Sequence, residues 1–419
     1  MHRDFEANVT KIYRRRDLLT ALDLVVHSVL QFRFQGDVVR KGWVEGLIIG
    51  DTRCGKSESV GRMVNHYRVG ELVTGENATF AGLIGGMQQT QKTWSITWGK
   101  FPLNDRRFLV IDELSGLPQE AISRMSGVRS SGVAEIIKIQ TERTPARVRT
   151  LWMSNPRGKR PIAAFNSGIE AIQDLIGQPE DIARFDFALT VATGEVPLSV
   201  INAAEHPRTA HVYTSQACNR LIYWAWSRKP DQIVFAPGAE AECLSQATRL
   251  SQRYVPPLVE GAEQRIKIAR LAVAAAARVY STDETGELVV VKPEHVQFVA
   301  EYLDTIYSKP SMAFDVHSRA KLADREIADV QEVQDRFNST SADVRSLLAD
   351  SASFTVVDLQ DYLGVDREAA QEFASFLVRK RCVRKGKFGY YKLPAFIQFL
   401  RHFKHGVQHR EPGADDAPF

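Results

Sequence analysis

The chain has 419 residues, of which 44% are hydrophobic and 25% are charged, and its formal net charge at pH 7 is +4. This composition is typical of a globular protein with a large core, and the length predicts two or three domains. The charge is too small to indicate a nucleic-acid partner by itself. No apolar run is long enough to span a membrane and the first residues do not resemble a signal peptide, so we expect a soluble, cytoplasmic protein with no membrane partner. The four cysteines lie far apart, which predicts neither a zinc site nor a disulfide framework.

The first clear motif is an apolar segment at 44–49 that runs into G-x-x-x-x-G-K-S at 50–57. An amphipathic pattern predicts a helix before it, at 14–34, and another helix is expected at 57–67. In such a loop the backbone amides surround the phosphates of a nucleotide, the lysine adds a cation and the serine is a ligand of Mg²⁺. We therefore expect ATP and Mg²⁺ to bind at eight residues: Gly50, Asp51, Thr52, Arg53, Cys54, Gly55, Lys56 and Ser57.

Strands and helices alternate from this loop to about residue 193, which predicts an α/β fold with a parallel sheet flanked by helices. The strands are expected at 107–113, 148–153 and 185–189.

Polar residues end two of these strands. An ATPase needs one carboxylate near the metal and a second to polarise water, so we assign Asp112 to Mg²⁺ and Glu113 to catalysis. Asn155 follows the next strand and would place its amide beside the γ-phosphate. The alternative for Asn155 is an ordinary Asn-Pro turn that closes the strand.

From about residue 198 the pattern becomes helical, and near residue 340 a further domain begins. There the order of helix, short β segment, two helices and hairpin predicts a winged helix. The expected parts are a helical segment over 1–45, an α/β core over 46–195, a helical lid over 196–310, a linker helix over 311–340, a winged helix over 341–405 and a disordered tail over 406–419.

Basic residues cluster at the end of the second helix of this winged helix and on its hairpin, interleaved with aromatic residues. This combination suits contact with the DNA backbone, although winged helices also bind proteins. The cations expected to contact nucleic acid are Arg379, Arg381, Arg384, Lys385 and Lys387.

Four short motifs follow one another along the chain: Gly50-Asp51, Ile111-Asp112-Glu113, Asn155-Pro156 and Arg184-Phe185-Asp186. In this order they resemble the motifs of the AAA+ ATPases and, within them, of the minichromosome-maintenance (MCM) helicases. The resemblance covers roughly residues 15–307, with a winged helix following as in that family. The loop reads Thr-Arg-Cys-Gly where the helicases usually read Pro-Gly-Thr-Ala or Pro-Gly-Thr-Gly, so the relationship is divergent.

The resemblance implies a P-loop AAA+ core with a helical lid, and it implies roles for further residues. Asn155 would be a sensor, and Arg184 an arginine finger for the ATP of a neighbouring subunit. The alternative for Arg184 is a structural ion pair with a nearby aspartate. A second sensor arginine should open a lid helix, and Arg265 is the candidate, with Arg270 as the alternative.

Two insertions lie where the helicases carry hairpins that grip DNA. Lys92 in 88–94 and Lys138 in 133–144 would contact phosphates there, unless these are ordinary solvated loops. The family's N-terminal DNA-encircling domain has no counterpart before the core. We therefore expect that a separate protein supplies that function or that the protein acts without it.

These features favour an ATP hydrolase that forms a ring, expected to be a hexamer. It would act as a helicase or translocase on single-stranded or duplex DNA, in the replication of a mobile element, phage or bacterium. The alternative is a replication initiator, loader or protein-remodelling ATPase that binds DNA without processive unwinding. A nucleotide-gated module without hydrolysis is disfavoured because both Asp112 and Glu113 are present.

Overall fold

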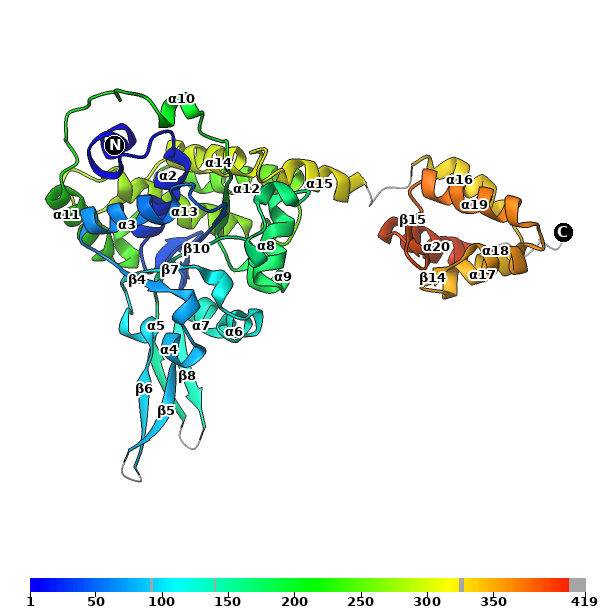
Figure 1. The fold of residues 1–419 in the computed structure, drawn as a ribbon, viewed down its shortest axis with the longest axis horizontal. Coiled ribbons are helices and arrows are strands. Elements are labelled where there is room, and N and C mark those ends of the chain that lie inside the picture. The colour runs from blue at the N-terminus through cyan, green and yellow to red at the C-terminus, as the bar shows by residue number, and fades with distance from the viewer. Residues whose placement is uncertain (91–92, 139–140, 324–327, 407–419) are drawn as a thin grey trace, which may run out of the picture. The chain divides into compact units, whose positions relative to one another are not determined.

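The computed structural model describes residues 1–90, 93–138, 141–323 and 328–406 of the chain (Figure 1). It divides into two compact units, Met1–His317 and Ser318–Phe419. The division falls within the segment expected to be a single linker helix, which instead contains α15 (Phe314–Ala323) and α16 (Val330–Asn338). Of the expected disordered tail, residues 407–419 lie outside the described ranges. None of the helices in those ranges is long and apolar enough to cross a lipid bilayer.

The first unit is built on a five-stranded parallel sheet in the order β11-β3-β10-β7-β4. Two of its central strands, β3 and β10, are buried at every position, as expected for parallel strands that are covered on both faces. The predicted α/β class and parallel sheet are therefore confirmed. The strands are β3 (Glu45–Gly50), β4 (Glu71–Thr74), β7 (Phe108–Asp112), β10 (Arg149–Ser154) and β11 (Phe187–Val191).

The helix expected at 14–34 is shorter in the structure. Helix α2 (Arg16–Val26) packs on β3, β10 and β11 and is followed by an antiparallel hairpin, β1 (Phe32–Phe34) and β2 (Asp37–Val39). The expected helix was too long because residues 32–34 alternate between buried and exposed, and Gly36 makes the turn with φ +85°.

Most of the remaining elements of this unit are short helices and turns around the sheet. They are α1 (His2–Asp4), η1 (Phe5–Thr10), α3 (Lys56–Tyr67), η2 (Gly75–Asn77), α4 (Phe80–Leu83), α5 (Lys100–Leu103), η3 (Leu114–Gly116), α6 (Gln119–Arg124), α7 (Ser126–Ser131), η4 (Arg157–Lys159), η5 (Ile162–Ala164), α8 (Gly168–Ile176), α9 (Pro179–Ala183) and α10 (Leu198–Ile201).

The segment expected to be a helical lid lies in the same compact unit as the sheet. Helix α13 packs on α2, and α14 packs on β11. A short parallel pair, β12 with β13, was not expected, because three-residue strands leave too little periodicity in the sequence. The elements are α11 (Ser215–Trp226), η6 (Pro230–Gln232), β12 (Ile233–Phe235), α12 (Ala239–Arg253), α13 (Gln264–Arg278), β13 (Val289–Val291) and α14 (Pro293–Tyr307).

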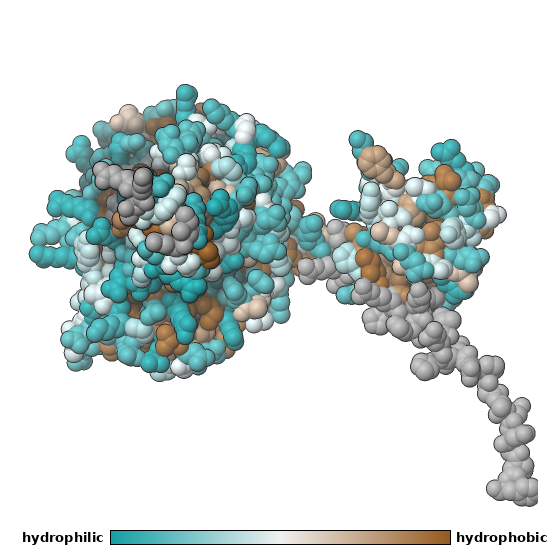
Figure 2. Space-filling view, turned by 90° about the horizontal axis from the view of Figure 1, so that it is seen from below, coloured by the Kyte–Doolittle hydropathy of each residue, from teal (hydrophilic) through white to brown (hydrophobic). Residues whose placement is uncertain are grey.

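Two antiparallel hairpins extend from one end of the first unit (Figure 1). One pairs β5 (Gly85–Thr90) with β6 (Thr93–Trp98), and the other pairs β8 (Val133–Ile137) with β9 (Thr141–Pro145). Strands β5 and β8 are in contact, so the hairpins lie side by side. Figure 2 is viewed from this end and shows a mostly hydrophilic face on this unit, with hydrophobic residues in small separate groups.

The second unit has its own apolar core, which includes Phe337, Leu348, Phe354, Phe373 and Leu377. Its strands form a sheet in the order β14-β16-β15. We refer to the β15–β16 hairpin, residues 383–392, as the wing. The elements after α16 are α17 (Ala342–Asp350), β14 (Ser353–Phe354), α18 (Val356–Leu363), α19 (Arg367–Arg379), β15 (Val383–Gly386), β16 (Gly389–Lys392) and α20 (Pro394–Gly406), the last of which was not expected.

Buried charges attach α13 to the amino edge of the sheet. Asp186 accepts a hydrogen bond from the backbone nitrogen of Glu45 at 2.8 Å and forms a buried ion pair with Arg270. Lys267 donates to the carbonyl oxygens of Ala183 and Phe185 at 2.7 and 2.8 Å, and burial lowers its pKa to about 8. Because these partners lie at the start of β3 and just before β11, helix α13 and the starts of both strands are held together.

Arg270→Met should therefore lower the free energy of unfolding of the first unit by about 3 to 5 kcal/mol, because it leaves Asp186 buried without its counter-charge. Urea denaturation followed by tryptophan fluorescence would measure this. Arg265→Met is the matched control, since Arg265 is an exposed residue of the same helix and its loss should change stability by less than about 0.5 kcal/mol. Equal stability of the two variants would contradict the structural role of Arg270.

Candidate nucleotide-binding site

The loop at 50–57 connects β3 to α3 at the carboxyl edge of the sheet. At its start there is no room for a side chain, since a Cβ atom on Gly50 would lie 2.1 Å from the carbonyl oxygen of Val191. At its end Gly55 has a left-handed backbone with φ +78°. Both glycines are therefore required by the backbone path that presents the loop's amides to an anion.

Lys56 is held between the loop and the end of β10. Its ammonium group donates to the carbonyl oxygens of Gly50 and Asp51 at 2.9 and 2.6 Å, and to the Oδ1 of Asn155 at 3.0 Å. Burial lowers the pKa of Lys56 below its usual value. The structure thus brings together the lysine and the amide that the sequence analysis assigned to the phosphate site.

Asp112 and Glu113 lie at the end of β7, next to the short helix η2 that follows β4. The Oδ1 of Asp112 accepts a hydrogen bond from the backbone nitrogen of Glu113 at 2.9 Å, and Glu113 has an unusual left-handed φ of +54°. Partial burial and the carboxylate of Glu76 raise the pKa of Glu113. A carboxylate with a raised pKa is a stronger base, which suits the polarisation of water.

Glu76 had not been recognised from the sequence, because nothing in its local pattern distinguishes it from a solvated glutamate. Its place beside Glu113 depends on a close approach of η2 and η3. A Cβ atom on Gly116 would lie 2.4 Å from the Cα atom of Glu76, so only glycine allows this contact.

The carboxylate of Asp51 stabilises the loop through hydrogen bonds to two distant backbone segments. Its two oxygens accept hydrogen bonds from the backbone nitrogens of Ile162 and Thr193 at 2.7 and 2.8 Å. The sequence placed Asp51 among the nucleotide-binding residues because it lies in the motif. In the structure its side chain instead ties the loop to the segments that follow β10 and β11.

A pocket of about 730 Å³ opens beside the loop and is large enough for a nucleotide base and sugar. Cys54 and Gly55 form one side, and Ile12, Tyr13 and His206 line it from distant parts of the chain. The rings of Tyr13 and His206 are stacked, with centroids 3.7 Å apart. These residues could not be recognised from the sequence, because they lie outside any motif and meet only in the folded chain.

The segment that carries His206 is fastened to the start of the chain through Asp4. The Asp4 carboxylate accepts hydrogen bonds from the backbone nitrogens of Val212 and Tyr213, both at 2.8 Å, and pairs with His211 at 3.0 Å. Although burial opposes ionisation, these hydrogen bonds lower the pKa of Asp4 to about 2. One wall of the pocket is thereby fixed by a contact far from the phosphate loop.

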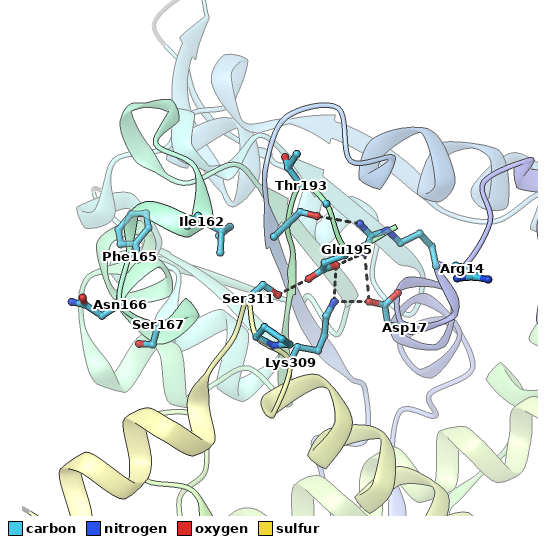
Figure 3. Close-up of a pocket in the computed structure, with 15 residues that line it drawn as sticks. Arg14, Asp17, Ile162, Phe165, Asn166, Ser167, Thr193, Glu195, Lys309 and Ser311 are labelled. Atoms are coloured by element: carbon cyan, nitrogen blue, oxygen red, sulfur yellow. Dashed lines mark hydrogen bonds and ion pairs between the residues drawn. The ribbon is translucent and has the colours of Figure 1, made fainter. Parts of the chain in front are cut away.

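A second pocket, of about 640 Å³, shares Arg15 and the turn at 192–194 with the first (Figure 3). Four of its five charged side chains form ion pairs with one another. Glu195 pairs with Arg15 and with Lys309, and Lys309 also pairs with Asp17 at 2.7 Å. This cluster joins the N-terminal segment to the ends of β11 and α14, so we interpret it as a structural joint.

Arg184 lies at the amino edge of the sheet, opposite the phosphate loop. It precedes β11, whose residues 187–191 run parallel to residues 46–50 of β3, and a strand of this length spans about 16 Å. The side chain is 30% exposed, and its Nε is 3.9 Å from the nearest carboxylate oxygen of Asp181. Arg184 is therefore too far away to serve the phosphates bound by its own subunit.

The two candidates for the second sensor differ in the structure. Arg270 is buried, pairs with Asp186 and donates to the carbonyl oxygen of Lys41 at 2.8 Å, so its guanidinium is not available to a nucleotide. Arg265 is exposed near the start of α13. Of the two, only Arg265 remains a candidate for the second sensor arginine.

The predicted nucleic-acid contacts that fall within the described ranges lie on exposed surfaces. Lys138 is exposed on the β8–β9 hairpin, whereas Lys92 lies outside the described residues. In the second unit the five predicted cations are all exposed: Arg379, Arg381, Arg384, Lys385 and Lys387.

Ser57 and Asp112 suit Mg²⁺ bound together with a nucleotide. Within the described ranges no group of three His, Cys, Asp or Glu residues could hold a metal alone. Mg²⁺ at nucleotide sites needs only one or two protein oxygens, because phosphates and water complete its shell. The exposed hydroxyl of Ser57 and the carboxylate of Asp112 match that requirement.

The chain was compared with known protein families and with curated proteins. Residues 5–195 match the family model of the MCM P-loop domain. The matched range contains the phosphate loop, the carboxylates after β7, Asn155 and Arg184. A search of curated proteins found no similar sequence.

Asp51→Ala should destabilise the first unit by roughly 2 to 5 kcal/mol, because it leaves two backbone N–H groups without acceptors. It should also weaken ATP binding by loosening the loop. Chemical denaturation and titration with a fluorescent ATP analogue would measure both effects, with exposed Asp37→Ala as the control. Normal stability combined with lost ATP affinity would instead indicate a direct contact with the nucleotide.

Proposed function

We propose that the protein forms a ring and uses ATP hydrolysis to translocate along DNA or unwind it, because residues 5–195 match the family model of the MCM P-loop domain. The separation of the catalytic groups carries this proposal. Lys56, Glu113 and Asn155 lie at the carboxyl edge of the sheet, and Arg184 lies at the amino edge. A head-to-tail interface would bring the amino edge of one subunit to the loop of the next, and such interfaces form a ring when the rotation between successive subunits closes. We expect a hexamer.

Each group has a defined role in this proposal. The loop amides and Lys56 bind the phosphates, while Ser57 and Asp112 hold Mg²⁺, which neutralises phosphate charge. Glu113 accepts a proton from the attacking water, and Asn155 orients the γ-phosphate. Arg184 and Arg265 of the neighbouring subunit stabilise the charge that develops during transfer.

DNA would be held by the hairpins and by the second unit. The hairpins extend from one end of the core (Figure 1), so a ring would present one pair of hairpins from each subunit. Lys138 is exposed there, and we assign the same role to Lys92 from its place in the sequence. If DNA binding by the hairpins is coupled to ATP hydrolysis, the protein would act in DNA replication. A separate protein would then supply any further DNA-encircling function.

A second function is supported by the separate C-terminal unit with its exposed cations. The protein could bind DNA through this unit and use ATP to load or remodel other proteins, without unwinding. Both functions require the same nucleotide site. They differ in whether ATP hydrolysis moves the protein along DNA or changes the arrangement of other proteins.

Mixing two inactive variants would test the shared site. Lys56→Ala should abolish nucleotide binding or hydrolysis, whereas Arg184→Ala should keep binding and lose turnover. In randomly mixed rings, roughly a quarter of the junctions would combine an intact Lys56 with an intact Arg184, so ATPase activity should partly return. Steady-state phosphate release would measure it.

Arg106→Ala is the matched control, because Arg106 is an exposed arginine at the same edge of the sheet and should not be required for turnover. Failure to recover activity at any mixing ratio, in rings shown to exchange subunits, would refute the shared site.

ATPase assays with and without DNA would test the translocase proposal. Single-stranded or duplex DNA should raise the rate of ATP hydrolysis, and Lys138→Ala should reduce that stimulation. Hydrolysis that DNA does not change would refute translocation. Stimulated hydrolysis without strand displacement of a forked duplex would favour the loader or remodelling function.

A further inference from the structure

The second unit separates its charges along the chain. Residues 355–378, which contain α18 and all of α19 except its last residue, hold five carboxylates and one arginine. The next residues, 379–392, contain the wing and hold seven cations and no carboxylate. Because the groove of a DNA duplex is lined by phosphates, these two surfaces would interact with DNA in opposite ways.

The acidic part includes the exposed side of α19, the helix that would enter the major groove if this unit bound DNA as winged helices commonly do. Asp366 caps the helix by accepting a hydrogen bond from the backbone nitrogen of Ala369 at 2.9 Å. Glu368 and Glu372 are exposed on its first two turns, while Phe373 faces the core. Like charges therefore oppose the approach of α19 to the groove.

The basic part keeps most of its cations available to a partner. Lys380 pairs with Asp329 and Glu332, and Lys392 donates to the carbonyl oxygen of Leu348 at 2.7 Å. The remaining five are exposed at the end of α19 and on the wing: Arg379, Arg381, Arg384, Lys385 and Lys387.

The tip of the wing carries an exposed aromatic ring. Gly386 pairs with Gly389, so Lys387 and Phe388 form a two-residue turn. Phe388 is 78% exposed, the highest value among the large hydrophobic residues in the described ranges. The ammonium group of Lys387 lies 5.4 Å from the centre of its ring. Apolar side chains flanked by cations are a recurring means of entering the minor groove.

We propose that the second unit binds duplex DNA through the wing, and that α19 stays outside the major groove. Arg384, Lys385 and Lys387 contact phosphates, and Phe388 enters the minor groove. This rests on the proposed function only in assuming that the protein acts on DNA. Because bases are read chiefly in the major groove, binding is largely independent of sequence.

The test is binding of the full-length protein to a short fluorescent duplex, measured by anisotropy at several salt concentrations. The triple variant R384A/K385A/K387A should reduce the slope of log K against log salt concentration by about 2 to 3, since each phosphate contact contributes about 0.9. Phe388→Ala should weaken binding about tenfold without changing this slope. A duplex of scrambled sequence should bind equally well.

The matched control is R367A/Q371A, which removes the neutral and basic side chains with which α19 would read bases. These residues are exposed, as are the wing residues, so the folds should be kept, and circular dichroism melting would verify this. The control should bind as the wild type does. The inference is overturned if the control weakens binding as much as the wing variant does, or if the wing variant keeps the full salt slope.

The result is separable from the test of the proposed function. If DNA stimulates the wild-type ATPase but the wing variant keeps the full slope, the inference fails and the translocase proposal stands. If the wing variant loses the slope but DNA does not change ATP hydrolysis, the inference stands and the translocase proposal fails. A wing that contributes nothing to DNA binding would instead be a surface for an acidic protein.

Discussion

The parallel register of β3 with β10 and β11 is the constraint on which the rest of this structure depends. It brings the phosphate loop, Asn155 and the turn after β11 to one edge of the sheet, and it sends Arg184 to the other. A buried aspartate secures the register at each edge. Asp51 accepts backbone N–H groups at the carboxyl edge, and Asp186 accepts one at the amino edge.

Residues that end a predicted strand could be placed from the sequence, because a buried parallel strand leaves a long apolar run whose end is easy to find. For this reason Lys56 and Asn155 were both assigned to the phosphate site, and in the structure the Nζ of Lys56 lies 3.0 Å from the Oδ1 of Asn155. The order of elements from α17 to the wing could be read for a similar reason, since each of these helices has a side-chain N-cap.

Contacts between distant segments could not be predicted in this way. Tyr13 and His206 stack across almost two hundred residues of sequence, and neither belongs to a motif. Glu76 meets Glu113 only because Gly116 allows the backbones to approach. The role of Asp51 could not be predicted either. Its place in the motif indicated contact with the nucleotide, whereas its carboxylate binds backbone N–H groups more than one hundred residues away.

The attachment of α13 to the amino edge has a mechanical consequence. Lys267 holds the carbonyl oxygens on both sides of Arg184, and the same helix carries Arg265. Arg184 and Arg265 are therefore held in one group of elements, which the buried Asp186–Arg270 ion pair joins together. In the proposed ring, Arg184 and Arg265 of one subunit would face the nucleotide of the next. A change in the charge of that nucleotide would then move α13 and the sheet of the neighbouring subunit together, with little local deformation.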